Sequence, residues 1–157
     1  MALLFMSQAV LLFKATAEQV RWPEHVLCNS PNFQLSYVSC DPFQDVGLTL
    51  NPCPDLHSVQ VNSSLSLVLN HSIEELYLSL DLIHGDQKPI HYDDSLCLSH
   101  LPRFTFCGRR KGELVNHDWP LKIKAIRYIK GQFNAEIRLV NQDGHQIACA
   151  NVSLNKG

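Results

Sequence analysis

The stretch VQVNSSLSLVLN, residues 59–70, decides the fold that the sequence predicts. Apolar side chains fall on alternate positions along most of it, and serine, asparagine and glutamine take the positions between them. Because successive side chains of a β-strand point to opposite faces, this pattern predicts a strand with one apolar face and one polar face. Asn62 and Asn70 each begin an Asn-x-Ser glycosylation sequon, and both fall on the polar face. A glycan must stand in solvent, so the sequons agree with the face that hydrophobicity makes outward.

The same alternation recurs along the chain on both sides of this stretch. It occupies residues 33–37, 46–50, 76–82, 121–124 and 133–139, and a last strand is predicted from His145 to about Leu154. Turns separate these segments at His84-Gly85-Asp86 and at residues 141–144, where Asp143-Gly144 suits a hairpin. The alternation breaks at Ala125-Ile126, as it would at a bulge. About eight short strands without an amphipathic helix predict an all-β fold, an antiparallel sandwich or barrel.

The N-terminus has the features of a secretory leader. An apolar run from Ala2 to Phe13 precedes Lys14-Ala15-Thr16-Ala17, which is a small-x-small cleavage signal. We therefore expect residues 1–17 to be a signal peptide and residues 18–157 to form a single domain. The alternative is a buried first strand or helix, and the run is shorter than the roughly 18 apolar residues of a membrane-spanning helix. The chain is accordingly predicted to be secreted and extracellular.

Six cysteines accompany this leader, at positions 28, 40, 53, 97, 107 and 149. An even number of cysteines in an oxidising compartment indicates disulfide bonds, although their spacing does not choose among the pairings. The sequence has no C-x-x-C pair and no close pair of histidines, so we predict no metal site and no cofactor. Asn151 begins a third sequon and shares the parity of Cys149, which conflicts with a cysteine that points inward and a glycan that points outward.

Charge and motifs exclude two classes of function. The net charge of −2 and a pI near 6.4 argue against nucleic-acid binding, which needs a concentrated cationic face. No Gly-x-Ser-x-Gly elbow and no glycine-rich phosphate loop is present. The acidic pairs Asp93-Asp94 and Glu74-Glu75 join neighbours that would point to opposite faces of a strand, so we interpret them as solvated. We predict that the chain is not an enzyme, and a secreted hydrolase is a distant alternative.

Four motifs in order give the chain a family resemblance. They are RWPEHVLC (residues 21–28), SCDPFQDVG (39–47), FTFCGRRKGE (104–113) and ACAN (148–151). Together they resemble the lipid-recognition family that includes myeloid differentiation protein two and the Niemann-Pick type C2 protein, over essentially the whole mature chain. The resemblance implies an immunoglobulin-like, two-sheet antiparallel sandwich splayed into a β-cup, with an apolar cavity between the sheets. It also implies disulfides between Cys28 and Cys53, Cys40 and Cys149, and Cys97 and Cys107.

The inward apolar side chains then have two interpretations. By composition alone they would fill the core of a sandwich, whereas the resemblance makes them the wall of a lipid cavity. The candidate lipid-binding residues are Leu35, Val46, Leu48, Leu50, Val59, Val61, Leu65, Leu67, Leu76, Leu78, Leu80, Phe104, Phe106, Leu114, Leu121, Ile123, Ile126, Tyr128, Phe133, Ile137 and Ile147. Tyr128 falls where myeloid differentiation protein two has a mobile aromatic residue at the cavity mouth.

An amphiphile also needs a site for its head group. The candidates are Arg103, Lys122, Lys124 and Arg127, because arginine and lysine bind phosphate. The alternative interpretation of these cations is a solvated face or a contact with a partner protein.

The resemblance implies a lipid-binding accessory glycoprotein with a phospholipid or a lipid A-like ligand. Its partner would be the ectodomain of a leucine-rich-repeat receptor, the radioprotective Toll-like homologue, which would hold it at the cell surface to temper innate immune and inflammatory responses to bacterial lipopolysaccharide. The loop between Cys97 and Cys107 lacks the acidic cluster that myeloid differentiation protein two uses against its receptor. Two alternatives remain open: a sterol or phospholipid carrier of the Niemann-Pick C2 type that acts without a receptor, and an adhesion sandwich with a filled core.

Overall fold

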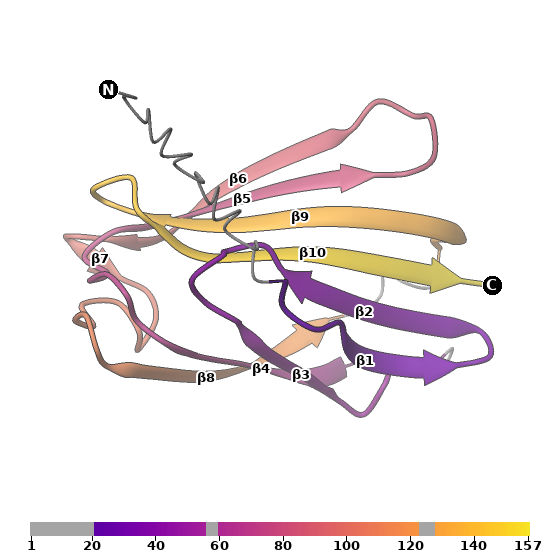
Figure 1. Ribbon diagram of the computed structural model, residues 1–157, viewed down its shortest axis with the longest axis horizontal. Coiled ribbons are helices and arrows are strands. Elements are labelled where there is room, and N and C mark those ends of the chain that lie inside the picture. The colour runs from indigo at the N-terminus through magenta and orange to yellow at the C-terminus, as the bar shows by residue number, and fades with distance from the viewer. Residues whose placement is uncertain (1–20, 56–59, 123–127) are drawn as a thin grey trace, which may run out of the picture.

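The computed structural model of the chain describes residues 21–55, 60–122 and 128–157 (Figure 1). The predicted signal peptide and the predicted bulge lie outside these residues. Five candidate site residues also lie outside them, Val59, Ile123, Lys124, Ile126 and Arg127, and so does the side chain of a sixth, Lys122. In the described part, no helix has the length and apolar character that crossing a membrane requires.

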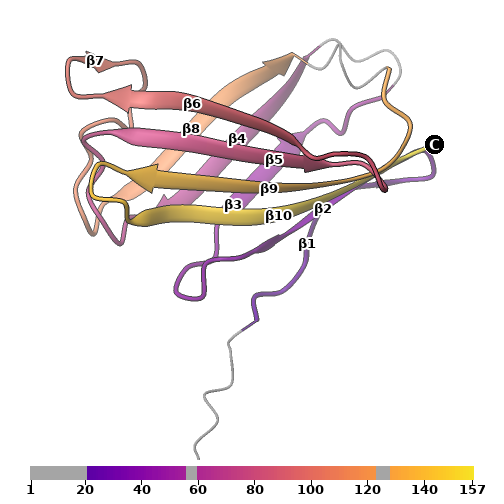
Figure 2. The same ribbon diagram turned by 90° about the horizontal axis from the view of Figure 1, so that it is seen from above.

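Ten strands form two antiparallel sheets in the described part of the chain. The larger sheet has seven strands in the order β1-β2-β10-β9-β5-β6-β7, and the smaller has three in the order β3-β4-β8. Their bounds are β1 His25–Ser30, β2 Phe33–Ser39, β3 Gly47–Asn51, β4 Gln60–Val68, β5 Leu76–Ile83, β6 Ile90–Leu98, β7 Leu101–Pro102, β8 Leu114–Lys122, β9 Gly131–Asn141 and β10 Gln146–Lys156. The sheets lie face to face with their strands crossing at an angle (Figure 2). The predicted all-β, two-sheet antiparallel sandwich is confirmed.

The alternating stretches of the sequence form strands where they were predicted, in β2, β3, β4, β5, β9 and β10. The predicted hairpin joins β9 to β10, and the Gly144 N–H donates to the Asn141 carbonyl oxygen at 3.1 Å. Gly144 has a φ of +77°, a conformation that favours glycine at this turn. The prediction for residues 121–124 was misplaced, because β8 begins seven residues earlier, at Leu114, and its described part ends at Lys122.

One end of the sandwich is closed by a buried cluster. It consists of Leu67, Leu69, Ile73, Leu76, Cys97, Phe106, Val115 and Ile147. The loop between β7 and β8 is joined to the segment between β4 and β5 by backbone hydrogen bonds, including Gly112 N–H to the Leu69 oxygen and Gly108 N–H to the Ile73 oxygen. This end therefore has a tightly packed core of the ordinary kind.

The three disulfides that the resemblance implies are all present. Cys28–Cys53 joins β1 of the large sheet to the chain that leaves β3 of the small sheet. Cys40–Cys149 joins the end of β2 to β10, and Cys97–Cys107 joins β6 to the loop before β8. Cys149 pairs in register with Arg138, and Asn151 pairs with Glu136, so both point to the outer face of the large sheet. The apparent conflict of parity disappears because Cys149 points outward too and is buried against Cys40.

Candidate functional site

Tyr37 identifies the face of the large sheet that turns toward the small sheet. Its hydroxyl donates to the Val46 carbonyl oxygen at 2.6 Å and accepts from the Leu48 N–H of β3 at 2.9 Å. Strand register continues this inner face from Tyr37 through Val152, Ala135 and Leu82. We call the side of the large sheet that carries these residues its inner face.

A second row of residues on the inner face shows how far the small sheet covers that face. The row runs from Ser39 through Ala150, Ile137 and Leu80 to Tyr92, each paired in register with the next. Ala150 is 5% exposed, Ile137 and Leu80 are half-buried, and Tyr92 is 52% exposed. Exposure of the inner face therefore increases from the middle of the sheet toward β6.

The adjoining row shows the same trend on β6, where Ile90 pairs with Leu82 and is 65% exposed. Figure 1 shows β1 beside β3 at one side of the molecule and the β5–β6 hairpin far from the small sheet at the other. The sheets are held together along β1 and β3 and separate toward β6. In a filled sandwich these apolar side chains would be buried, so the apolar face near β6 is only partly covered by protein.

The small sheet faces this region with apolar and aromatic side chains. Register pairs Leu65 with Leu48 and with His117, and it places Trp119 and Leu121 on the same face. The His117 ring stacks on the Trp119 ring, with 5.9 Å between the ring centroids. It also packs edge to face against the Phe106 ring, with 5.0 Å between the centroids. All of these side chains except Phe106 are half-buried. They form the wall opposite the inner face of the large sheet.

The described lipid-binding candidates fall into three groups: half-buried, buried and exposed side chains. Ten are half-buried: Leu35, Leu48, Leu50, Leu65, Leu78, Leu80, Phe104, Leu121, Phe133 and Ile137. Six are buried by protein atoms: Val46, Val61, Leu67, Leu76, Phe106 and Ile147. Four of these six belong to the buried cluster at the closed end, where they pack against protein: Leu67, Leu76, Phe106 and Ile147. The half-buried group provides the apolar surface available to a ligand.

Two predicted lipid contacts have exposed side chains, and the prediction is wrong for Leu114. Leu114 pairs with Val68 on the outer face of the small sheet and is 57% exposed. Its place follows from strand parity, because Val115 on the next position points inward and is buried. Tyr128 is 86% exposed on the segment that leads into β9, so it is a surface residue, and its place at the cavity mouth stays a prediction.

Several wall residues were not among the predicted contacts. Leu82 and Leu139 stood in the alternating pattern, and both are half-buried on the inner face. Ile90, Tyr92, His117 and Trp119 had no such signal, because their strands mix polar and apolar residues on one face. Only the register of β6 and β8 against their neighbours shows that they belong to the wall.

Arg103 is the one predicted head-group residue whose side chain is described. Its Nη1 donates to the Ser95 carbonyl oxygen at 3.1 Å and lies 3.8 Å from an Asp94 carboxylate oxygen. Its guanidinium carbon lies 5.6 Å from the centre of the Phe104 ring. Asp94 pairs with Leu78 and so belongs to the inner face. The cation therefore lies beside the exposed part of the wall, but a carboxylate already balances part of its charge.

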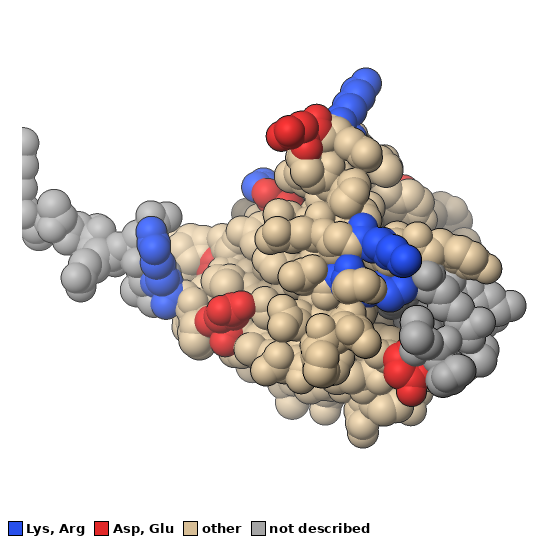
Figure 3. Space-filling view, turned by 90° about the vertical axis from the view of Figure 1, so that its right-hand side faces the viewer, with Lys and Arg blue, Asp and Glu red and all other residues tan. Residues whose placement is uncertain are grey.

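The end of the molecule in Figure 3 carries a small group of lysine and arginine side chains with scattered carboxylates on a largely uncharged surface.

Among the described residues, no group of three metal-ligating side chains is assembled. Asp93 and Asp94 point to opposite faces of β6, because Asp93 contacts His91 on the outer face and Asp94 contacts Arg103. This arrangement does not bring the two carboxylates together for acid–base chemistry.

Comparison with known proteins places this architecture among characterised relatives. Residues 27–155 match the ML domain. Lymphocyte antigen 86 of Mus musculus is 32% identical over 133 residues, which are 85% of this chain and 82% of the relative. Lymphocyte antigen 86 of Gallus gallus is 30% identical over 145 residues, which are 92% of this chain and 91% of the relative.

A solved structure is similar over the same region. The crystal structure of chicken MD-1 complexed with lipid IVa superposes with a TM-score of 0.77 and 31% identity, covering 86% of this chain and 98% of that one. The Cys-Gly-Arg-Arg-Lys-Gly-Glu and Ser-Cys-Asp-Pro motifs predict, within the lipid-recognition family, a likeness to myeloid differentiation protein one, also called lymphocyte antigen 86. These comparisons confirm that likeness.

Proposed function

We propose a function from the premise that this chain belongs to the ML-domain family: it is a secreted, non-enzymatic glycoprotein that binds an amphiphilic lipid between its two sheets. The ligand is a phospholipid or a lipid A-like molecule, and its acyl chains lie on the inner face near β5 and β6. Lymphocyte antigen 86 is a relative over most of the chain, and the related chicken MD-1 has been solved in complex with lipid IVa.

The observation that carries this proposal is the rise in exposure across the inner face, from 5% at Ala150 to 52% at Tyr92. Covering exposed apolar surface is favourable, at about 0.8 kcal/mol for each buried methylene group. An acyl chain of about fourteen carbons would therefore contribute on the order of 10 kcal/mol before the losses of ordering are subtracted. That amount is sufficient for stable capture of a lipid, and the buried cluster at the closed end allows the protein to fold around it.

Charge substitution on β5 tests the proposal. Leu78→Glu places a carboxylate on the inner face, whereas Ser79→Glu places the same group on the outer face of the same strand. We expect the Leu78 variant to be secreted with little or no extractable lipid, because a charge buried against acyl chains is strongly unfavourable. The Ser79 variant should keep the lipid content of the wild type. Mass spectrometry of lipids extracted from the purified secreted proteins measures both.

Equal lipid content in the wild type and the Leu78→Glu variant would refute this placement of the ligand. Absence of lipid from all three proteins, together with no uptake of added phospholipid or lipid A, would refute the proposed function.

We further propose that the chain acts with the ectodomain of a leucine-rich-repeat receptor, the radioprotective Toll-like homologue, and is held at the cell surface through it. In this role it tempers innate immune responses to bacterial lipopolysaccharide. The relationship to lymphocyte antigen 86 supports this proposal. Coexpression of the tagged chain with that ectodomain should give a complex that co-purifies. A protein that ignores the ectodomain but transfers sterol or phospholipid between vesicles would instead be a carrier of the Niemann-Pick C2 type.

A further inference from the structure

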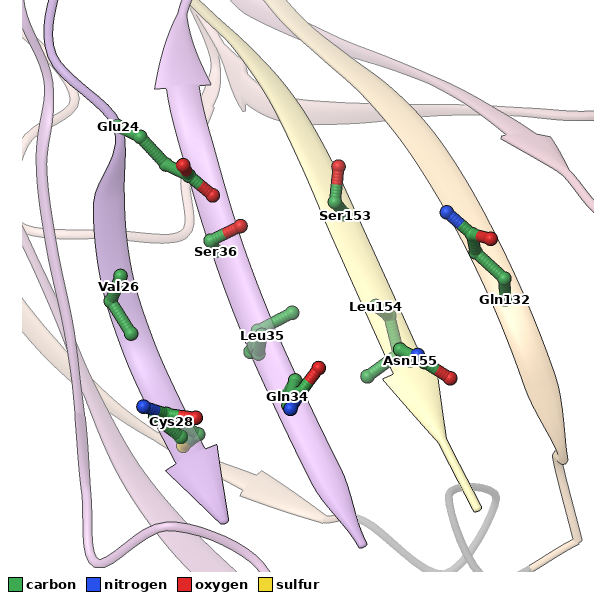
Figure 4. Close-up of a pocket in the computed structure, with 11 residues that line it drawn as sticks. Glu24, Val26, Cys28, Gln34, Leu35, Ser36, Gln132, Ser153, Leu154 and Asn155 are labelled. Carbon is green, nitrogen blue, oxygen red and sulfur yellow. The ribbon is translucent and has the colours of Figure 1, made fainter. Parts of the chain in front are cut away.

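A groove of about 360 Å³ with a mixed polar and apolar lining lies on the outer face of the large sheet, away from the lipid-facing surface. It lies where β2 begins and β10 ends, and side chains from four adjacent strands contribute to it (Figure 4). Gln34, Ser36, Ser153 and Asn155 line it on the outer face. Leu35 and Leu154 also belong to the lining, but their parity turns their side chains toward the inner face.

Three amide side chains form a row across this groove. Register pairs Gln34 of β2 with Asn155 of β10, and Asn155 with Gln132 of β9. Within the described ranges, none of these three side-chain amides hydrogen-bonds to another protein group. Each amide therefore offers two donors and one acceptor to a ligand. In the next row, the Ser153 hydroxyl donates to the Asn134 side-chain oxygen at 3.3 Å.

The chemistry of this lining suits a neutral ligand rich in hydroxyl and acetamido groups. No lysine or arginine lines the groove, and Glu24 at its margin is the one charged residue of the lining. A phosphate or a carboxylate would find no cation there, and the apolar part of the lining is too small to hold an acyl chain. Carbohydrate has the matching set of donors and acceptors.

An N-glycosylation sequon lies next to the groove on the same strand face. Asn151 begins the sequon Asn151-Val152-Ser153, is exposed, and points outward like Ser153 and Asn155. At about 3.3 Å per residue, Ser153 lies roughly 7 Å and Asn155 roughly 13 Å from Asn151 along β10. The Asn151 side-chain amide makes no hydrogen bond within the described part of the chain. A glycan on Asn151 could therefore extend along β10 over the row of amides.

We propose that this groove binds the first sugars of a glycan attached to Asn151. The N-acetyl and hydroxyl groups of those sugars hydrogen-bond to Gln34, Gln132 and Asn155, which holds the glycan against the sheet. The outer face at this end of the large sheet is then covered by the protein's own carbohydrate and is not a docking surface for a protein partner. The proposal does not depend on the lipid ligand, because the groove and the inner face lie on opposite sides of the sheet.

The test measures how fast each glycan is removed from the native protein. The secreted wild type and a Gln34→Ala, Gln132→Ala, Asn155→Ala variant are treated with a peptide N-glycosidase without denaturant, and glycopeptide mass spectrometry follows each site. Asn151 should carry a glycan, and its release should be roughly fivefold faster in the variant, as expected for the loss of about two weak net hydrogen bonds. In the Asn155→Ala single variant, measured in the same way, glycan release at Asn151 should be accelerated less. This single variant replaces the triple variant if the triple variant is not secreted.

The control variant Gln87→Ala, Asn116→Ala removes two exposed amides outside the groove and should release the Asn151 glycan at the wild-type rate. Release at Asn62, on the small sheet, should be the same in all of these proteins. An unmodified Asn151, or an equal rate at Asn151 in the wild type and the groove variants, overturns the proposal. Unchanged release at Asn151 combined with weaker capture by the receptor ectodomain would also overturn it and would make the groove a protein-binding surface.

Discussion

Tyr37 shows how a single side chain joins the two sheets. Its ring is 2% exposed, and its hydroxyl satisfies one carbonyl group and one N–H group at the start of β3. Burial raises the pKa of this phenol above its ordinary value, with a smaller contribution from the nearby Asp45 carboxylate, while the hydrogen bond from Leu48 acts in the opposite direction. The hydroxyl therefore remains protonated at physiological pH and keeps donating to Val46.

Removing that hydroxyl should destabilise the protein. In Tyr37→Phe the Val46 oxygen and the Leu48 N–H lose their partner in a buried place, which costs about 1–3 kcal/mol of the free energy of unfolding. Tyr92→Phe is the matched control, because Tyr92 is largely exposed and its hydroxyl has no partner among the described residues. Urea denaturation of both variants should show a loss for Tyr37→Phe alone. Equal stability of the two variants would contradict this account of the contact.

We expect the stability of the β5–β6 hairpin to depend on pH through His91. Its Nδ1 lies 2.6 Å from an Asp81 carboxylate oxygen and its Nε2 lies 2.8 Å from one of Asp93. The hydrogen bond to Asp81, followed by the one to Asp93, raises the pKa of His91 above its ordinary value. Because the folded-state pKa is the higher one, the stabilisation is complete below the unfolded value of about 6.5 and is lost as the pH rises through the folded value.

Substitution by an uncharged side chain tests this dependence. The wild type should melt at a higher temperature than His91→Gln at about pH 5.5, and the difference should be smaller at about pH 8.5, because the stabilisation is lost as the pH rises through the raised pKa of His91. Thermal denaturation followed by circular dichroism at both pH values measures it. A difference that does not change with pH would show that the two carboxylates do not act through the charge of His91.

Among the elements, the strands that alternate in the sequence were predictable and those that do not alternate were missed. β5 could be read directly, because Leu76, Leu78, Leu80 and Leu82 alternate with polar residues or tyrosine. β6 escaped prediction because its inner face mixes Ile90 and Tyr92 with Asp94, a pattern without an apolar stripe. Most of β8 was missed for a similar reason, since Asn116, His117 and Asp118 interrupt it.

Site residues could be predicted from the sequence where the strands that carry them could be predicted. Alternation on β5 and β9 placed Leu78, Leu80 and Ile137 correctly on the inward side. Sequence alone could not say which inward residues would be buried and which only half-buried, because that depends on how far apart the two sheets lie. The pairing of six cysteines depends on the same three-dimensional arrangement, and here it came from the resemblance.

Removal of the Cys40–Cys149 disulfide and removal of the Cys28–Cys53 disulfide should have different effects on stability and on lipid retention, because the two bonds join different elements. Cys40–Cys149 closes a separation of 109 residues between neighbouring strands of one sheet, whereas Cys28–Cys53 closes 25 residues and joins the two sheets at their shared side. In the chain-entropy view the longer loop contributes about 4.8 kcal/mol and the shorter about 3.5 kcal/mol as upper values. Replacing Cys40 and Cys149 by alanine should therefore lower the unfolding free energy more.

Lipid retention should follow the opposite order. Loss of Cys28–Cys53 frees the side along which β1 and β3 hold the sheets together, so the alanine variant of that pair should retain less lipid than the Cys40, Cys149 variant. Urea denaturation and extraction of bound lipid from the same preparations measure both quantities. If the two variants rank in the same order for stability and for lipid, the disulfides affect binding only through overall stability.

At the scale of the whole molecule, the sandwich combines a packed end with an uncovered apolar face. The buried cluster around Leu76 and Phe106 supplies an ordinary core, and the Cys28–Cys53 disulfide holds the sheets together at the side of β1 and β3. Toward β6 the inner face is increasingly exposed. Exposed apolar surface of this kind marks a binding site, and its position between two sheets suits a long, flexible chain.

Trp119 offers the most direct measurement of the central claim, that acyl chains lie between the sheets. It is on the inner face of the small sheet and is one of two tryptophans in the chain, so a Trp22→Phe variant has Trp119 as its only indole. A phospholipid with brominated acyl chains should quench the Trp119 fluorescence, and the same lipid without bromine should not. Co-elution of the brominated lipid with the protein while Trp119 remains unquenched would contradict the account.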